Sequence, residues 1–319
     1  MEQMDLEAAF EGSASPAISW NEESARRGLD ELFSLTRQYK SSKTYRGLLD
    51  FIARFRFYSP FNAMLIHVQM DGARFVAPPH RWLQQYRRSI KPGGHPLVIL
   101  QPMGPVLFVF DVSDTIPEEN APLLPREVTN PFEVREGKVK VVNELELTIK
   151  NACRDGVEVS ERVAGSQSAG LIKPANMGRS LDFQIKERPE PEFVQIPLRY
   201  ELLLNASHSD AAKYATLVHE LGHLYCGHLG TPDERWWPDR RGLPYDVAEF
   251  EAESICYLVC TRLGIDNPSD EYLACFMKAN KETLPISLEC VMKAAGLIEQ
   301  MGRQRLKPRK EKQKVEAGR

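Results

Sequence analysis

The sequence has few cysteines, and none of them forms a CxxC pair. The six lie between residues 153 and 290, at Cys153, Cys226, Cys256, Cys260, Cys275 and Cys290. Structural zinc sites made of thiolates normally use closely spaced pairs, so we expect no such site here. Cys256 and Cys260 lie four residues apart in an apolar helical pattern, and we interpret the cysteines as small buried hydrophobic residues in a reducing compartment.

Long apolar segments are also absent. No run approaches the about 20 residues that a membrane-spanning helix needs. Residues 1–11 are acidic and contain no apolar run, which does not fit a secretory signal. We therefore expect a cytoplasmic protein without a membrane partner. Its 319 residues, 42% hydrophobic and 27% charged, have the composition of a globular protein and predict two domains.

The small net charge of −3 hides an uneven distribution. The window 26–91 holds 13 basic and 4 acidic residues, a local charge of +9. The window 303–319 holds 8 basic and 2 acidic residues, a local charge of +6, and the stretch between them is acidic. This pattern predicts a basic N-terminal module, an acidic module that carries the chemistry, and a basic tail.

Apolar periodicity predicts the helices, and short apolar runs between turn signals predict the strands. The expected helices are 22–39, 45–57, 61–70, 82–86, 143–153, 210–228, 248–263 and 288–301. The expected strands are 97–100, 106–112, 181–186 and 193–197. Residues 117–131 contain four prolines and are the best linker candidate. We expect Asp210 to cap the helix that begins there.

The motif His219-Glu220-Leu221-Gly222-His223 lies within the helix expected at 210–228. Two histidines four residues apart project from one face of a helix and can hold one Zn²⁺, with Glu220 beside them. Zinc lowers the pKa of a bound water to about 7, and Glu220 is placed to accept its proton as general base. The motif therefore predicts one zinc ion per chain, although another divalent metal could occupy the same ligands.

A catalytic zinc site needs a third protein ligand. His228 is one residue short of the spacing in HExxHxxGxxH, so we do not expect it to be the ligand. The acidic run Glu249-Phe250-Glu251-Ala252-Glu253 is the better source. We assign Glu249 as ligand and Glu253 as the carboxylate that orients a ligand histidine, with the reverse assignment left open. Glu251 points away from this face and is expected to be solvated.

Aromatic and basic side chains alternate in the N-terminal module. Residues 26–91 hold 11 of the 28 aromatic residues. Proteins that bind single-stranded nucleic acid combine a basic groove with aromatic faces on which bases stack, whereas the competing interpretation is a core of aromatics under solvated arginines. The candidate nucleic-acid-binding residues are Arg54, Arg56, Tyr58, Arg81, Trp82, Arg87, Arg88 and Lys91. No role follows from the sequence for Asn62, His67 or Gln69.

The segment from Tyr214 to His223, with Glu249, Glu251 and Glu253 after it and Val194 to Pro197 before it, resembles the ImmA/IrrE-type metallopeptidases. It is closer still to the metallopeptidase domain of ArdC-like antirestriction proteins. Tyr58 to Asn62, Gln69, Trp82, Lys91 to Gly93 and Val109 to Val112 resemble the N-terminal domain of the ArdC-like proteins. Two features depart from the family patterns. Glu253 stands where ImmA-like proteins usually carry Asn, although ArdC-like proteins are more often acidic there, and Trp236-Trp237 does not match a feature of either family.

The resemblance implies an α+β protein, with a mixed N-terminal ArdC-like module followed by a mainly helical, zincin-like metallopeptidase domain with a small sheet. We divide the chain into a disordered N-terminus (1–20), an N-terminal domain (21–116), a linker (117–131), a metallopeptidase domain (132–302) and a disordered basic tail (303–319). The N-terminal domain is expected to bind single-stranded DNA.

The resemblance further implies hydrolysis of a peptide or protein substrate such as a transcriptional repressor. The strand expected at 193–197, just before the motif helix, could either pair with an extended substrate or be a purely structural strand. The alternative function is that of a DNA-binding antirestriction protein whose metal site is structural or vestigial. A third interpretation is an intracellular peptidase without a role on DNA.

Overall fold

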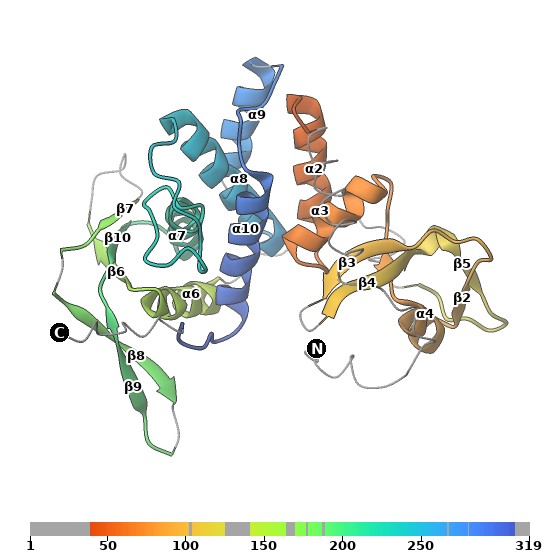
Figure 1. The fold of residues 1–319 in the computed structure, drawn as a ribbon, viewed down its shortest axis with the longest axis horizontal. Coiled ribbons are helices and arrows are strands. Elements are labelled where there is room, and N and C mark those ends of the chain that lie inside the picture. The colour runs from red at the N-terminus through yellow and green to blue at the C-terminus, as the bar shows by residue number, and fades with distance from the viewer. Residues whose placement is uncertain are drawn as a thin grey trace, which may run out of the picture.

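The computed structural model describes residues 39–101, 104–124, 141–163, 170–176, 178–186, 189–266, 268–279 and 281–309. The fold is α+β, as the sequence predicts, with helices at the centre and small sheets on either side (Figure 1). The helix expected at 22–39 and the predicted N-terminal segment 1–20 lie outside the described residues, as do 125–131 of the predicted linker. No helix in the described part of the chain is long and apolar enough to cross a membrane.

The N-terminal part consists of two core helices followed by short strands. Helices α2 (Ser42–Arg54), α3 (Pro60–Gln69) and α4 (Pro79–Tyr86) agree with the predicted segments to within a few residues. The hydroxyls of Ser41 and Ser59 cap α2 and α3 by accepting from backbone N–H groups. Strands β1 (Val76–Ala77), β4 (Gly104–Asp111) and β3 (Leu97–Gln101) form an antiparallel sheet in that order. β2 (Arg88–Ile90) pairs with β5 (Thr115–Pro117), which follows the 3-10 turn η2 (Val112–Asp114).

Two residues without a predicted role protect the outer edge of β3. The side-chain amide of Asn62 accepts from the N–H of Leu100 and donates to its carbonyl, both at 3.0 Å. The amide of Gln69 makes the same pair of bonds with the backbone of Val98, at 2.8 and 2.9 Å. A bare strand edge offers unpaired N–H and C=O groups to other chains. Helix α3 therefore covers this edge with two amides that imitate a neighbouring strand.

The C-terminal part of the described chain is mainly helical, with two small sheets. It contains α6 (Val142–Arg154), α7 (Asp210–Tyr225), α8 (Tyr245–Leu263), α9 (Ser269–Ala279) and α10 (Leu288–Arg303). A mixed sheet has the order β6 (Val157–Arg162), β10 (Tyr200–Asn205), β7 (Gly170–Pro174). β10 runs parallel to β6 and antiparallel to β7. A separate hairpin joins β8 (Ser180–Lys186) to β9 (Glu192–Pro197).

Several boundaries differ from the sequence-based expectations. The sequence does not predict β6, β7, β10 or α9. Helix α7 is capped by Ser209, whose hydroxyl accepts from the N–H of Ala212, and Asp210 is its first residue. The helix ends at Tyr225, because the backbone leaves the helical region at Gly227, where φ is +82°. Only glycine fits at this position, since a Cβ would lie 2.0 Å from the carbonyl oxygen of Pro238. The chain thus turns at Gly227 and folds the following loop back on itself.

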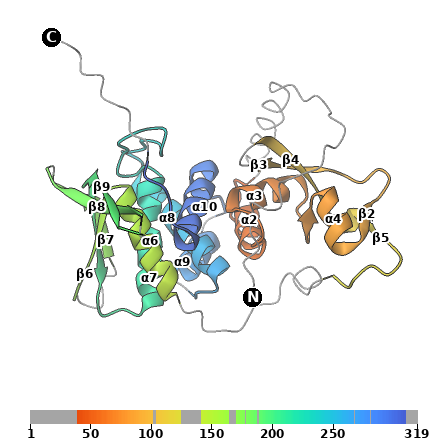
Figure 2. The same cartoon turned by 90° about the horizontal axis from the view of Figure 1, so that it is seen from below.

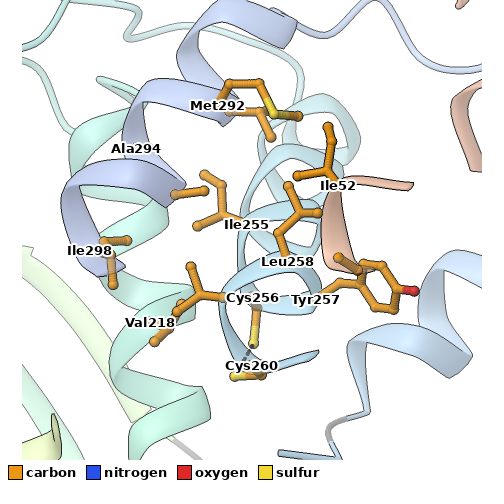
Figure 3. Close-up of a cluster of buried hydrophobic side chains, with 14 of the residues drawn as sticks. Ile52, Val218, Ile255, Cys256, Tyr257, Leu258, Cys260, Met292, Ala294 and Ile298 are labelled. Carbon is orange, nitrogen blue, oxygen red and sulfur yellow. Dashed lines mark hydrogen bonds between the residues drawn. The ribbon is translucent and has the colours of Figure 1, made fainter. Parts of the chain in front are cut away.

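One hydrophobic core joins the two predicted domains. Helices α2 and α3 pack beside α8 and α10, as both views show (Figures 1 and 2). Ile52 of α2 lies with Leu258 of α8 and Met292 of α10 in the same buried cluster (Figure 3). All three side chains are fully buried. The predicted boundary between the domains therefore does not divide the core.

Residues 303–309 of the predicted basic tail belong to the described part of the chain, and residues 310–319 lie outside it. Arg303 is the last residue of α10, and residues 304–309 have defined contacts. The N–H of Leu306 donates to Asn151 Oδ1 at 2.9 Å, and Arg309 forms an ion pair with the buried carboxylate of Asp155 at 2.6 Å. The guanidinium of Arg309 also lies 5.3 Å from the ring centre of Trp236 and 5.4 Å from that of Trp237. These contacts fix residues 304–309 against the C-terminal part.

Candidate metal centre

Helix α7 presents the two motif histidines because its opposite face is buried. The buried residues of this helix are Tyr214, Ala215, Leu217, Val218, Leu221, Gly222, Leu224 and Tyr225. Helices α7 and α8 pack closely at Gly222, where an added Cβ would already be in van der Waals contact with the Cα of Ala252 at 3.4 Å. Ala252 is next to Glu251 and three residues after Glu249. The close helix contact therefore brings the acidic run of α8 up to the histidines of α7.

The structure brings His219, His223 and Glu249 together. The Nε2 atoms of the two histidines are 3.2 Å apart. His223 Nε2 lies 3.4 Å from Glu249 Oε1, and His219 Nε2 lies 3.7 Å from Glu249 Oε2. Burial, with a further contribution from His223, lowers the pKa of His219, which favours the neutral imidazole that metals bind.

These separations fit a metal ion. Ligand atoms about 2.1 Å from a tetrahedral zinc centre lie about 3.4 Å from one another, close to the three observed distances. Two imidazoles and one carboxylate form the ligand set of catalytic zinc sites that leave a fourth position open. The residues present therefore fit Zn²⁺, and metal binding itself stays a prediction.

Glu220 is held by the sheet next to these ligands. Its Oε2 accepts a hydrogen bond from the backbone N–H of Ile172 in β7 at 2.9 Å. Burial raises the pKa of Glu220, whereas His223 and the Ile172 N–H oppose this rise. Ile172 is opposite Leu202 in the pairing of β7 with β10, so an N–H that reaches Glu220 points away from β10. This edge of β7, which pairs with no other strand in the described part of the chain, therefore runs alongside the candidate general base.

Strand β9, for which a substrate-pairing and a purely structural role are both expected, does not contact Glu220 in the structure. β9 pairs with β8 in the separate hairpin, while β7 is the strand that meets Glu220. Glu253, the predicted orienting carboxylate, has its Oε1 3.7 Å from Nδ1 of His219. This distance is long for a hydrogen bond and allows an electrostatic contact.

Glu251 is not on a solvated face, contrary to the prediction. It is 0% exposed and accepts from His228, from Arg240 and from the backbone N–H of Ser287. Burial raises the pKa of Glu251, but these hydrogen bonds outweigh it and lower the pKa to about 2. The prediction failed because α8 is covered on both sides by the loop after α7 and by the start of α10.

His228 is close to the site without joining the three ligands. Its Nδ1 lies 2.9 Å from Nδ1 of His223, and its Nε2 lies 2.9 Å from Glu251 Oε2. Cys226, His228 and Glu251 also bring possible ligand atoms within 4.8 Å of one another. Arg240 contacts both carboxylate oxygens of Glu251 at 2.7 and 2.8 Å. Its guanidinium supplies the positive charge that Glu251 needs, so this second group does not require a cation.

The tryptophan pair lies in the loop between His223 and Glu249. Trp237 is buried and donates from Nε1 to the carbonyl of Gly230 at 2.8 Å. Trp236 contacts Arg199 and Arg309 through its ring face. The two tryptophans therefore stabilise the conformation of this loop and contact Arg309 of the C-terminal segment.

The predicted nucleic-acid-binding residues differ in how exposed their side chains are. The prediction of Trp82 as a stacking residue is wrong, because it is 0% exposed and donates from Nε1 to the carbonyl of Phe110. Tyr58 is partly buried and donates to the carbonyl of Val76. Arg88 bonds to Thr115, while Lys91 reaches the carbonyl of Ser113. Arg54, Arg56 and Arg87 are exposed, and Arg81 is partly exposed and contacts Gln85.

Comparisons with known proteins give one structural likeness. No protein-family model and no curated protein sequence matches the chain. Among solved structures, the metal-free crystal structure of the antirestriction protein ArdC from plasmid R388 is 15% identical, with a TM-score of 0.33. The match covers 77% of this chain and 82% of that chain. At this TM-score the two backbones do not superimpose as wholes, so neither site nor function is transferred from it.

Proposed function

We propose that the protein binds one divalent metal ion, zinc by the chemistry of its ligands, and hydrolyses a peptide bond. His219, His223 and Glu249 would hold the ion, and Glu220 would act as general base. The observation that carries this proposal is the convergence of two imidazole nitrogens and one carboxylate at 3.2–3.7 Å beside Glu220. A zinc ion bound there would supply Lewis acidity.

The residues around the ligands support this chemistry. The Ile172 N–H holds one oxygen of Glu220, so the carboxylate has a fixed orientation, and its second oxygen can accept a proton. The neighbouring free edge of β7 supports a polypeptide as substrate, because an extended peptide can pair with an exposed strand edge. The side chain of Leu171 in β7 is exposed and could make an apolar contact with a side chain of a bound peptide.

Metal content and hydrolysis test the proposal together. We expect about one zinc per chain in the wild type and loss of zinc in His223→Ala, while His208→Ala, a histidine outside the ligand set, keeps its zinc. Glu220→Gln should retain zinc and lose about 10²–10⁴-fold in the cleavage rate of a fluorogenic peptide mixture, the range of a general base. A folded wild type that takes up no added zinc would refute the metal site. Equal cleavage by Glu220→Gln would refute the assigned base.

A second candidate function is the binding of single-stranded DNA, and Phe57 favours it. This ring is 55% exposed, sits edge-on against Phe75, and follows the exposed Arg56. Stacking on an aromatic ring contributes about 1–3 kcal/mol per base. Phe57→Ala should therefore weaken binding of a labelled oligothymidylate by about 5–150-fold.

The matched control for this test is Phe193→Ala. Phe193 is also 55% exposed and lies on β9 in the C-terminal hairpin, so its replacement should leave oligonucleotide binding unchanged. Glu220→Gln should likewise bind DNA as the wild type does. Equal losses in Phe57→Ala and Phe193→Ala would contradict a stacking site at Phe57.

A further inference from the structure

A chain of four side chains leads from the interior of the protein to a metal ligand. Arg240 holds both oxygens of Glu251 at 2.7 and 2.8 Å. Glu251 Oε2 lies 2.9 Å from His228 Nε2, and His228 Nδ1 lies 2.9 Å from His223 Nδ1. Glu251 is fully buried, and the side chain of His228 is only 6% exposed. His223 is the last member, and its Nε2 faces His219 and Glu249.

The direction of each hydrogen bond follows from the first member. The charge of Arg240 keeps Glu251 ionised, so this carboxylate can only accept, and His228 Nε2 must carry a proton. Because Arg240 already balances the charge of Glu251 through both carboxylate oxygens, the network does not need His228 as a second cation, and a neutral His228 with its proton on Nε2 has a bare Nδ1. The bond between the two Nδ1 atoms then requires the proton to be on His223.

We propose that Arg240, Glu251 and His228 form a positioning relay that fixes the tautomer and ring orientation of His223. With its proton on Nδ1, neutral His223 has a lone pair on Nε2, the atom that points at the other two ligands. The relay rests on the proposed metal site and adds three positioning residues to it. None of the three would contact the ion: they would act through His223, as partners of metal-bound histidines generally do.

The fold explains why these residues meet. The turn at Gly227 brings His228 and Arg240 together, since the N–H of Arg240 donates to the carbonyl of Gly227 at 2.9 Å. α8 supplies Glu251 two residues after the ligand Glu249. The N–H of Ser287, just before α10, also binds Glu251 at 2.7 Å. The loop between the ligands is therefore part of the site.

Zinc affinity, measured in competition with a chelating dye, tests the relay. His228→Ala should weaken zinc binding by about 10–100-fold, the usual effect of losing a partner of a ligand histidine. His228→Gln should recover most of the affinity, because its amide oxygen can accept from His223 while its N–H donates to Glu251. His208→Ala is the matched control and should bind as the wild type does. An unchanged affinity in His228→Ala would overturn the proposal.

The tautomer can be measured without metal. In the ¹⁵N-labelled, metal-free wild type, NMR should show His223 with a protonated Nδ1 and a bare Nε2, and His228→Gln should preserve this state. A protonated Nε2 on His223 in the wild type would overturn the relay, and this measurement decides even where His228→Ala fails to fold. A wild type with the expected tautomer and no zinc affinity would refute the proposed function and leave the relay intact.

Discussion

Arg262 in α8 ties the N-terminal helices to the helix that carries the candidate ligand Glu249. Its guanidinium forms an ion pair with Glu299 of α10 and donates to the carbonyls of Ile52, Phe55 and Tyr58 at 2.6, 3.0 and 2.7 Å. The side chains of Arg262 and Glu299 are 1% and 6% exposed. Replacing Arg262 therefore removes the buried partner of Glu299, which keeps only the exposed Arg303 at 3.3 Å, and removes one donor from each of the three carbonyls.

The expected loss follows from these two contributions. Removing one partner of a buried ion pair costs about 3–5 kcal/mol. Each of the three hydrogen bonds to carbonyls contributes about 1 kcal/mol net. We expect Arg262→Met to lower the free energy of unfolding by about 6–8 kcal/mol, a large part of the about 5–15 kcal/mol typical of a folded protein.

Urea denaturation of single and double variants separates the two contributions. The double variant Arg262→Met/Glu299→Met removes the unpaired charge and should recover the ion-pair part, leaving a loss of about 3 kcal/mol from the three carbonyls. Arg303→Met is the control: Arg303 contacts the same Glu299 at 3.3 Å but is 62% exposed, so its loss should stay below about 1 kcal/mol. A double variant as stable as the wild type would refute the role of Arg262 at the end of α2.

Two further predictions concern the strand edge and the tail. Asn62→Leu or Gln69→Leu should lower the free energy of unfolding by about 1–3 kcal/mol and promote self-association, because each leaves backbone groups of β3 unpaired. Urea denaturation and light scattering measure the two effects, with Gln84→Leu, at an exposed position, as the control. A monomeric variant of unchanged stability would contradict the edge-protecting role. Burial raises the pKa of Asp155, but hydrogen bonds from Arg309 and Arg154 outweigh this and lower the pKa below its usual value. The ionised Asp155 therefore stabilises the folded state fully above about pH 4, the pKa of Asp in an unfolded chain, and this stabilisation is lost as the pH falls further. Asp155→Asn should therefore melt earlier than the wild type at pH 7, with a difference that narrows below about pH 4; a difference independent of pH would disprove the assignment.

Local patterns predicted the helices well and the sheets poorly. The apolar spacing in α2, α3, α8 and α10 is set by one helical face, which is visible over a few turns of sequence. β10 needs a parallel partner from β6, more than forty residues earlier, and nothing in either segment announces that pairing. The C-terminal sheet was therefore missed, although the hairpin of β8 and β9 was predicted from its two short runs.

The candidate site shows the same division. His219, Glu220 and His223 follow from spacing on one helix, and Glu249 follows from the need for a third ligand on a nearby acidic helix. The bonds of His228 with Glu251 depend on the turn at Gly227, which sequence spacing does not reveal. Trp82 illustrates the converse error, because an aromatic residue among arginines can equally be a core residue, and only packing decides between the two.

The shared core limits how the chain can be divided. A fragment that ends in the segment 117–131 would carry α2 and α3 without the surfaces of α8 and α10, and would expose the side chains around Ile52 to water. The complementary fragment would leave Arg262 without the carbonyls it binds. The two halves are therefore expected to fold only when produced together. A substitution that destabilises the basic N-terminal half should then also destabilise the half that carries the histidines.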